Sequence, residues 1–153
     1  MEKILFKDVD TELEQIKIWI NKNKFDKKTK YLISYSTIRA CGVIEQCYKK
    51  IIHDYLSENA KSDTIGYLQK KIIDSSDNPK TGNIEKLLSE VNSQFCEDFK
   101  SKIQAHEKSD LNSLVQNRND FAHGRDIKIS INTVIKYFES SKNIINYLEE
   151  VLS

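Results

Sequence analysis

The sequence predicts an all-α fold, a helical bundle with two long amphipathic helices and several shorter ones. Only four glycines and one proline occur in 153 residues, so few positions interrupt a helix. Apolar residues recur at steps of three and four along most of the chain, as they do on one face of a helix. Alternation typical of a strand is confined to residues 127–131. The length suits one domain with a buried core, so we expect a single domain over residues 1–153.

The amino-terminal half is expected to hold a medium helix, a long helix and a short one. The first is predicted from about Asp10 to Asn21, with Asp8 or Asp10 as its cap. The second is predicted from about Lys28 to Glu58. Its apolar stripe consists of Thr37, Cys41, Ile44, Tyr48, Ile51 and Tyr55. A short helix around Ile65–Ile72, followed by a loop, completes this half.

The carboxyl-terminal half is expected to hold several further helices. One is predicted to begin behind Asn83 as its cap, and its apolar run continues to Ile103 after a break near Asn92. The last helix is predicted to begin near Ser130 or Asn132. Its stripe consists of Ile131, Val134, Ile135, Phe138, Ile145, Leu148 and Leu152.

Composition excludes several classes of protein. The net charge of +1 gives no protein-wide basic field, although a local basic groove stays open. No apolar run reaches the roughly 18 residues of a membrane span, and the first residues lack the layout of a signal peptide. Cys41, Cys47 and Cys96 are an odd number without CxxC spacing, which favours reduced thiols in a cytoplasmic protein. We expect no metal and no cofactor, because neither a cluster with metal-ligand spacing nor a Gly-rich phosphate loop occurs.

The most informative segment is Arg118–Gly124, which reads Arg-Asn-Asp-Phe-Ala-His-Gly. It ends a helix that is predicted to begin at Ser109 or Asp110, because glycine favours the left-handed position just beyond a helix. A guanidinium keeps its charge at any relevant pH and suits the extra negative charge of a pentacoordinate phosphorane. An imidazole gives and takes protons near neutral pH, which suits attack of a ribose 2′-hydroxyl on its neighbouring phosphate. The segment therefore indicates metal-free cleavage of RNA, and both polar heads are expected to be exposed.

The single histidine of the motif is too few for this chemistry, which needs a base and an acid. A two-fold dimer supplies both by setting the motif of one subunit against that of its mate. The sequence therefore predicts a homodimer with a composite site.

The segment resembles the Arg-x4-His signature of the HEPN superfamily, small helical domains that often act as dimeric, metal-independent ribonucleases. It reproduces the polar residue after the arginine and the Ala-His-Gly ending. The order of helices, with Asn-Ile-Glu-Lys-Leu-Leu ahead of the motif helix, is similar to that of the RiboL-PSP-type branch. The resemblance implies a HEPN-like bundle whose two motifs line one cleft. It also implies cleavage that leaves a 2′,3′-cyclic phosphate.

The resemblance also assigns expected roles to individual residues. The expected catalytic residues are Arg118, which stabilises the phosphorane, His123, which transfers the proton, and Asn119, which positions His123 or the phosphate. The expected supporting residues are Asp120, Glu45 and Arg125. In the RiboL-PSP-type branch an acidic residue on the long second helix often lies near the motif, which makes Glu45 the candidate. HEPN toxins silenced by AMP transfer carry a Tyr where this chain has Arg125, so that form of control is not expected.

These features together predict a homodimeric endoribonuclease that acts on RNA as a toxin or as an antiviral or stress effector. An antitoxin or an associated defence protein is the expected partner, and no membrane is. One alternative is a catalytically inactive HEPN module that binds RNA, a nucleotide or a partner protein. Another is a helical interaction protein in which the motif is only structural, with a surface ion pair, for example to Asp120, and a His123 that helps to end the helix.

Basic and aromatic residues outside the motif leave two interpretations open. A basic turn is formed by Lys22, Lys24, Lys27, Lys28 and Lys30. It either touches phosphates or is a solvated loop, and the solvated interpretation also applies to Lys49 and Lys50. The tyrosines at helical spacing are Tyr31, Tyr35, Tyr48, Tyr55 and Tyr67. They stack on bases if they are exposed, but their spacing favours core or dimer interface.

Overall fold

The computed structural model describes residues 2–153 and confirms the all-α prediction, because these residues form seven α-helices and no strand. The helices are α1 (Glu2–Lys22), α2 (Thr29–Ser57), α3 (Ser62–Leu68), α4 (Thr81–Val91), α5 (Ser93–Lys102), α6 (Ala105–Ala122) and α7 (Ile131–Leu152). One π-helical segment, η1 (Gln69–Ile73), continues α3. The strand-like alternation at residues 127–131 is a connection that ends where α7 begins.

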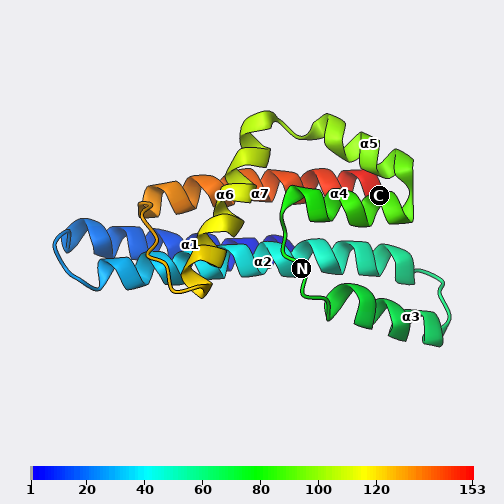
Figure 1. The fold of residues 1–153 in the computed structure, drawn as a ribbon, viewed down its shortest axis with the longest axis horizontal. Helices are drawn as coiled ribbons and strands as arrows, with labels where there is room; N and C mark the ends of the chain where they lie inside the picture. Colours follow the sequence, from blue (N-terminus) through cyan, green and yellow to red (C-terminus); the bar gives the residue numbers. More distant parts are fainter. Residues whose placement is uncertain (1) are drawn as a thin grey trace.

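Three long helices form the body of the molecule. Helices α1, α2 and α7 pack against one another, and α6 crosses them with contacts to both α2 and α7 (Figure 1). Helices α4 and α5 pack on each other at one side, while α3 and η1 lie along the second half of α2 (Figure 1). The end of α6 therefore lies over the first half of α2, on a rigid helical base.

One core holds these helices together. Its fully buried members include Val9, Ile44, Leu114, Phe138 and Leu148, which come from α1, α2, α6 and α7. Each such side chain contributes about 1.5–3 kcal/mol through the hydrophobic effect. Cys41, Cys47 and Cys96 are buried, as small apolar side chains would be, and form no disulfide within residues 2–153.

Helix α1 begins eight residues earlier than predicted. The predicted caps Asp8 and Asp10 lie inside the helix. The reason is tertiary, because Phe6 and Val9 are buried and the Phe6 ring meets Phe138 edge-on at 5.9 Å. Packing on α7 thus extends the helix beyond the acidic residues that favour a start.

The boundaries around α4, α5 and α6 are set by local hydrogen bonds. The predicted break near Asn92 is confirmed, since its side-chain oxygen accepts from Gln94 N at 2.8 Å and caps α5. Helix α4 begins at Thr81, ahead of the predicted cap Asn83. Helix α6 begins four residues before Ser109, because Gln104 and Glu107 form a capping box.

The last helix begins as predicted. Ser130 caps α7 by accepting a hydrogen bond from Thr133 N at 3.2 Å. No helix within residues 2–153 is both long and apolar enough to cross a membrane.

Candidate active site

The end of α6 has the geometry that its sequence predicts. Gly124 adopts a φ of 77°, the left-handed conformation that glycine tolerates best. The backbone N–H of Arg125 donates to Asp120 O at 2.8 Å and that of Gly124 donates to Phe121 O at 2.9 Å. These two bonds complete a Schellman motif. Because His123 is the last residue before this turn, its position is fixed by the backbone.

Arg118 is held on the body of the molecule by an acidic residue of α2. Its Nη2 lies 2.9 Å from Glu45 Oε2, and the exposed fractions of the two side chains are 32% and 21%. Its Nη1 donates to Asn119 Oδ1 at 3.2 Å. The expectation that the head of Arg118 is exposed therefore holds only in part. The structure does bring Glu45 to the motif, although 73 positions separate it from Arg118.

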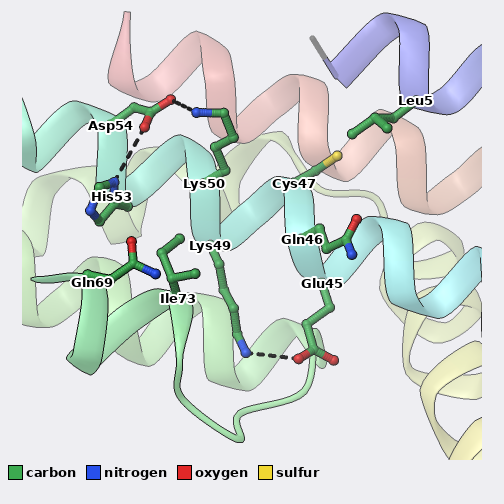
Figure 2. Close-up of a pocket in the computed structure, with 10 residues that line it drawn as sticks. All are labelled: Leu5, Glu45, Gln46, Cys47, Lys49, Lys50, His53, Asp54, Gln69 and Ile73. Atoms are coloured by element: carbon green, nitrogen blue, oxygen red, sulfur yellow. Dashed lines mark hydrogen bonds and ion pairs between the residues drawn. The ribbon is translucent and has the colours of Figure 1, made fainter.

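Lys49 holds the other oxygen of the same carboxylate. Its Nζ donates to Glu45 Oε1 at 2.8 Å and to the carbonyl oxygen of Ser75 at 2.6 Å. Figure 2 shows Lys49 and Glu45 reaching toward each other from one face of α2. The side chain of Lys49 is only 5% exposed, so its interpretation as a solvated lysine is wrong. Lys49, Glu45 and Arg118 form a continuous chain of charges, which we call the Lys49–Glu45–Arg118 relay.

Cys41 lies beside Arg118, one turn before Glu45 on α2. Burial raises the pKa of the Cys41 thiol to about 11, and the nearby Arg118 guanidinium opposes that rise. The thiol is therefore protonated at neutral pH, and a nucleophilic thiolate is not available here. Its role is to pack under the guanidinium.

His123 follows the last residue of α6 as its C-cap. It is exposed, and among residues 2–153 its ring forms no hydrogen bond or ion pair with another side chain. Asn119 does not orient it, because the Asn119 side-chain oxygen accepts from Arg118. The imidazole is thus free to meet a substrate.

Asp120 and Arg125 pair with each other at the end of α6. Arg125 Nη1 lies 2.9 Å from Asp120 Oδ1, which also accepts from Gln116 Nε2 at 3.0 Å. Asp120 is therefore not an ion-pair partner of Arg118 or His123, because the Schellman turn brings Arg125 to it instead, whereas His123 does stand at the end of the helix. The Arg125 side chain is 69% exposed, so much of its surface faces solvent at the end of α6.

The sequence was compared with known protein families and structures. The family model described as RiboL-PSP-HEPN matches residues 5–153. This chain belongs to the RiboL-PSP-HEPN family. Membership supports a nuclease or RNA-related role for this HEPN domain, and domains of this kind often bind RNA and dimerise. No curated protein and no solved structure matches the chain.

Lys49 and Tyr48 make contacts beside the candidate site that the sequence did not predict. Lys49 stands four residues after Glu45, a spacing that places both on one helix face and was the signal that could have found it. The loop contact of Lys49 with Ser75 carries no such signal, since it depends on how residues 74–80 fold back on α2. Tyr48 closes the same loop by donating to Asp77 O at 3.1 Å.

A cavity of about 450 Å³ opens beside the candidate site, between α2 and η1. Figure 2 shows Glu45 and Lys49 at one end of it and His53 with Asp54 at the other. His53 Nδ1 lies 3.4 Å from Asp54 Oδ1, so this histidine is paired within its own helix. Within residues 2–153 no group of three or more His, Cys, Asp or Glu side chains is arranged to hold a metal ion.

Proposed function

We propose that this HEPN domain is a metal-independent endoribonuclease that acts as a homodimer. The observation that carries the proposal is the difference between two side chains at the end of α6. Arg118 is fixed by an ion pair with Glu45, whereas His123 is exposed and available to a substrate. A fixed cation and an unpartnered imidazole are the two groups that cleavage by an internal 2′-hydroxyl requires.

In this proposal each motif residue has one role. A 2′-hydroxyl attacks phosphorus while one His123 accepts its proton, and the His123 of the second copy protonates the departing 5′-oxygen. The bond from phosphorus to that oxygen breaks, which leaves a 2′,3′-cyclic phosphate and a 5′-hydroxyl. Arg118 stabilises the extra negative charge of the phosphorane. Asn119 turns its side-chain oxygen to Arg118, so its amide NH₂ is directed to a phosphate oxygen.

The Lys49–Glu45–Arg118 relay supports this chemistry by fixing the guanidinium before substrate arrives. Lys49 anchors Glu45 through a nearly buried contact, and Glu45 in turn holds Arg118. A group that is already in place loses no further freedom in the transition state. Glu45 and Lys49 are therefore positioning residues.

Apolar side chains beside the motif favour contact with a second copy. Ile38 lies one turn before Cys41 on α2, and Phe121 lies one turn after Arg118 on α6. They are 43% and 38% exposed. Burying them against the same residues of a second copy brings the two His123 rings toward one cleft. We propose that the dimer acts as a toxin or an antiviral or stress effector, restrained by an antitoxin or an associated defence protein.

One observation favours the alternative, a catalytically silent HEPN module that binds RNA, a nucleotide or a protein. Both terminal nitrogens of Arg118 already donate within the chain, to Glu45 and to Asn119. An arginine held in this way has fewer donors left for a phosphate. Binding of RNA without cleavage would support this alternative.

The test is incubation of purified protein with total cellular RNA in EDTA, with product ends checked for 2′,3′-cyclic phosphate. His106 provides a matched control, because it is an exposed histidine at the other end of α6. Wild type and His106→Ala are expected to cleave, whereas His123→Ala and Arg118→Ala are not. Cleavage by His123→Ala would remove this histidine from the mechanism.

A further inference from the structure

The turn between α1 and α2 combines positive charge with exposed aromatic rings. Residues 22–31, here called the basic-aromatic turn, contain five lysines and one aspartate, whereas the whole chain has a net charge of only +1. Among the residues that the structure describes, none of these five lysines forms an ion pair with an acidic side chain. Their charge therefore faces solvent without compensation.

Two aromatic side chains of this turn lack the packing that aromatic residues normally find. Phe25 is 100% exposed and Tyr31 is 62% exposed. Lys30 Nζ lies 5.1 Å from the centre of the Tyr31 ring, so the ring already carries a cation beside it. An exposed phenylalanine gains nothing from folding, which points to a use in binding.

Tyr31 stands between two surface hollows. One, of about 380 Å³, is lined by Tyr31, Lys27, Lys30 and Ile127. The other, of about 560 Å³, is lined by Tyr31, Lys28 and Trp19. Both hollows are lined by the exposed Tyr31 ring and by at least one lysine. They have room for nucleotide bases, and their lysines can contact the phosphates that link those bases.

The hollow of about 380 Å³ also reaches the segment that follows the HEPN motif. Ile127, which lines it, comes four residues after His123. On α2, Tyr31 precedes Glu45, which pairs with Arg118, by 14 residues, so it lies about 21 Å from that contact along the helix axis. A strand that leaves the site along this segment therefore meets the turn within a few nucleotides.

We propose that the basic-aromatic turn is a binding surface for single-stranded RNA that extends the substrate path away from the motif. Phe25 and Tyr31 stack on bases, and Lys27, Lys28 and Lys30 contact phosphates. Such stacking accepts any base. RNA is favoured over an anionic membrane surface because two hollows are lined by Tyr31 and one of them is also lined by Ile127, four residues after His123, whereas lipid insertion needs only the tip at Phe25. The substrate role of this surface rests on the proposed ribonuclease function.

The test measures binding in a cleavage-dead background, so that it does not depend on activity. A fluorescein-labelled oligouridine is titrated with His123→Ala, alone and combined with Tyr31→Ala, and anisotropy is followed. Tyr67→Ala is the matched control, because Tyr67 is 60% exposed and Lys71 Nζ lies 5.7 Å from its ring, yet it lies on α3. Tyr31→Ala is expected to weaken binding about tenfold, and Tyr67→Ala to leave it unchanged.

A second variant tests the lysines through salt dependence. Replacement of Lys27, Lys28 and Lys30 by Gln should make the plot of log binding constant against log salt less steep by about 2, since each phosphate contact contributes about 0.7 for a single strand. Circular dichroism of every variant is expected to show an unchanged Tm.

Each result bears on one part of the proposal. Equal binding by Tyr31→Ala and the control, or an unchanged salt slope, overturns the surface. Sedimentation with vesicles of phosphatidylserine and phosphatidylcholine, lost in Phe25→Ser while RNA binding is kept, overturns it in favour of a lipid surface. If Tyr31→Ala loses RNA binding but wild type never cleaves RNA, the surface stands and the ribonuclease function fails.

Discussion

Glu45→Gln is the substitution that most sharply tests the Lys49–Glu45–Arg118 relay. Gln keeps the shape of Glu45 but removes the charge that holds two cations. The contact with Lys49, which is 5% exposed, is worth about 1.5–3 kcal/mol as a charge-assisted bond. Arg118 is 32% exposed, so solvent reduces its share to about 0.2–1 kcal/mol. We therefore expect a total loss of about 2–4 kcal/mol, which lowers Tm by about 5–12 °C in a chain of this length.

Thermal unfolding followed by circular dichroism at pH 7 measures this loss. Glu150→Gln is the matched control, since Lys102 Nζ lies 2.9 Å from Glu150 Oε2, with side chains that are 39% and 58% exposed. An exposed pair at this distance contributes little, so its Tm should barely change. Equal and small shifts in both variants would refute the claim that the relay is a structural anchor. In active protein, Glu45→Gln should also slow RNA cleavage about tenfold or more, because Arg118 is no longer fixed.

Three further outcomes are expected. Because the pKa of Cys41 is raised from 9.0 to about 11 in the folded chain, the native thiol keeps its proton longer than the unfolded one. Stability is therefore fully present below pH 9 and falls by about 2 kcal/mol toward pH 11; urea unfolding across this range should show a flatter profile for Cys41→Ala. Gly124→Ala should cost about 1–2 kcal/mol because its φ is 77°, whereas Gly42→Ala, where a Cβ meets nothing within 4 Å, should gain up to about 1 kcal/mol; opposite shifts in Tm check the pair. Arg118→Ala should lower Tm and His123→Ala should not, because only Arg118 is ion-paired; equal Tm values would contradict the asymmetry.

The sequence predicted what depends on local periodicity and local chemistry. The end of α6 at Gly124, the cap at Ser130 and the break at Asn92 follow from backbone preferences of a few residues. The start of α1 does not, because the burial of Phe6 against α7 decides it. Tertiary packing thus overrode the acidic residues that favour a helix start.

The candidate site was predictable to a similar degree. The motif alone predicted that Arg118 and His123 lie close together at the end of one helix. The resemblance to the family predicted that Glu45 lies near them. The burial of Lys49 was not predictable, because it depends on a loop carbonyl at Ser75. The exposure of Tyr31 was left open, since helical spacing alone does not say which face of a helix stays uncovered.

The most direct test of the composite site is RNA cleavage in EDTA by mixtures of wild type and His123→Ala at fixed total concentration. The two proteins are allowed to exchange subunits before RNA is added. If each cleft needs His123 from both copies, an equal mixture contains about a quarter fully wild-type dimers and retains about a quarter of the activity. Activity that instead falls in proportion to the wild-type fraction, to about a half, would show that each subunit cleaves alone and would contradict the composite site.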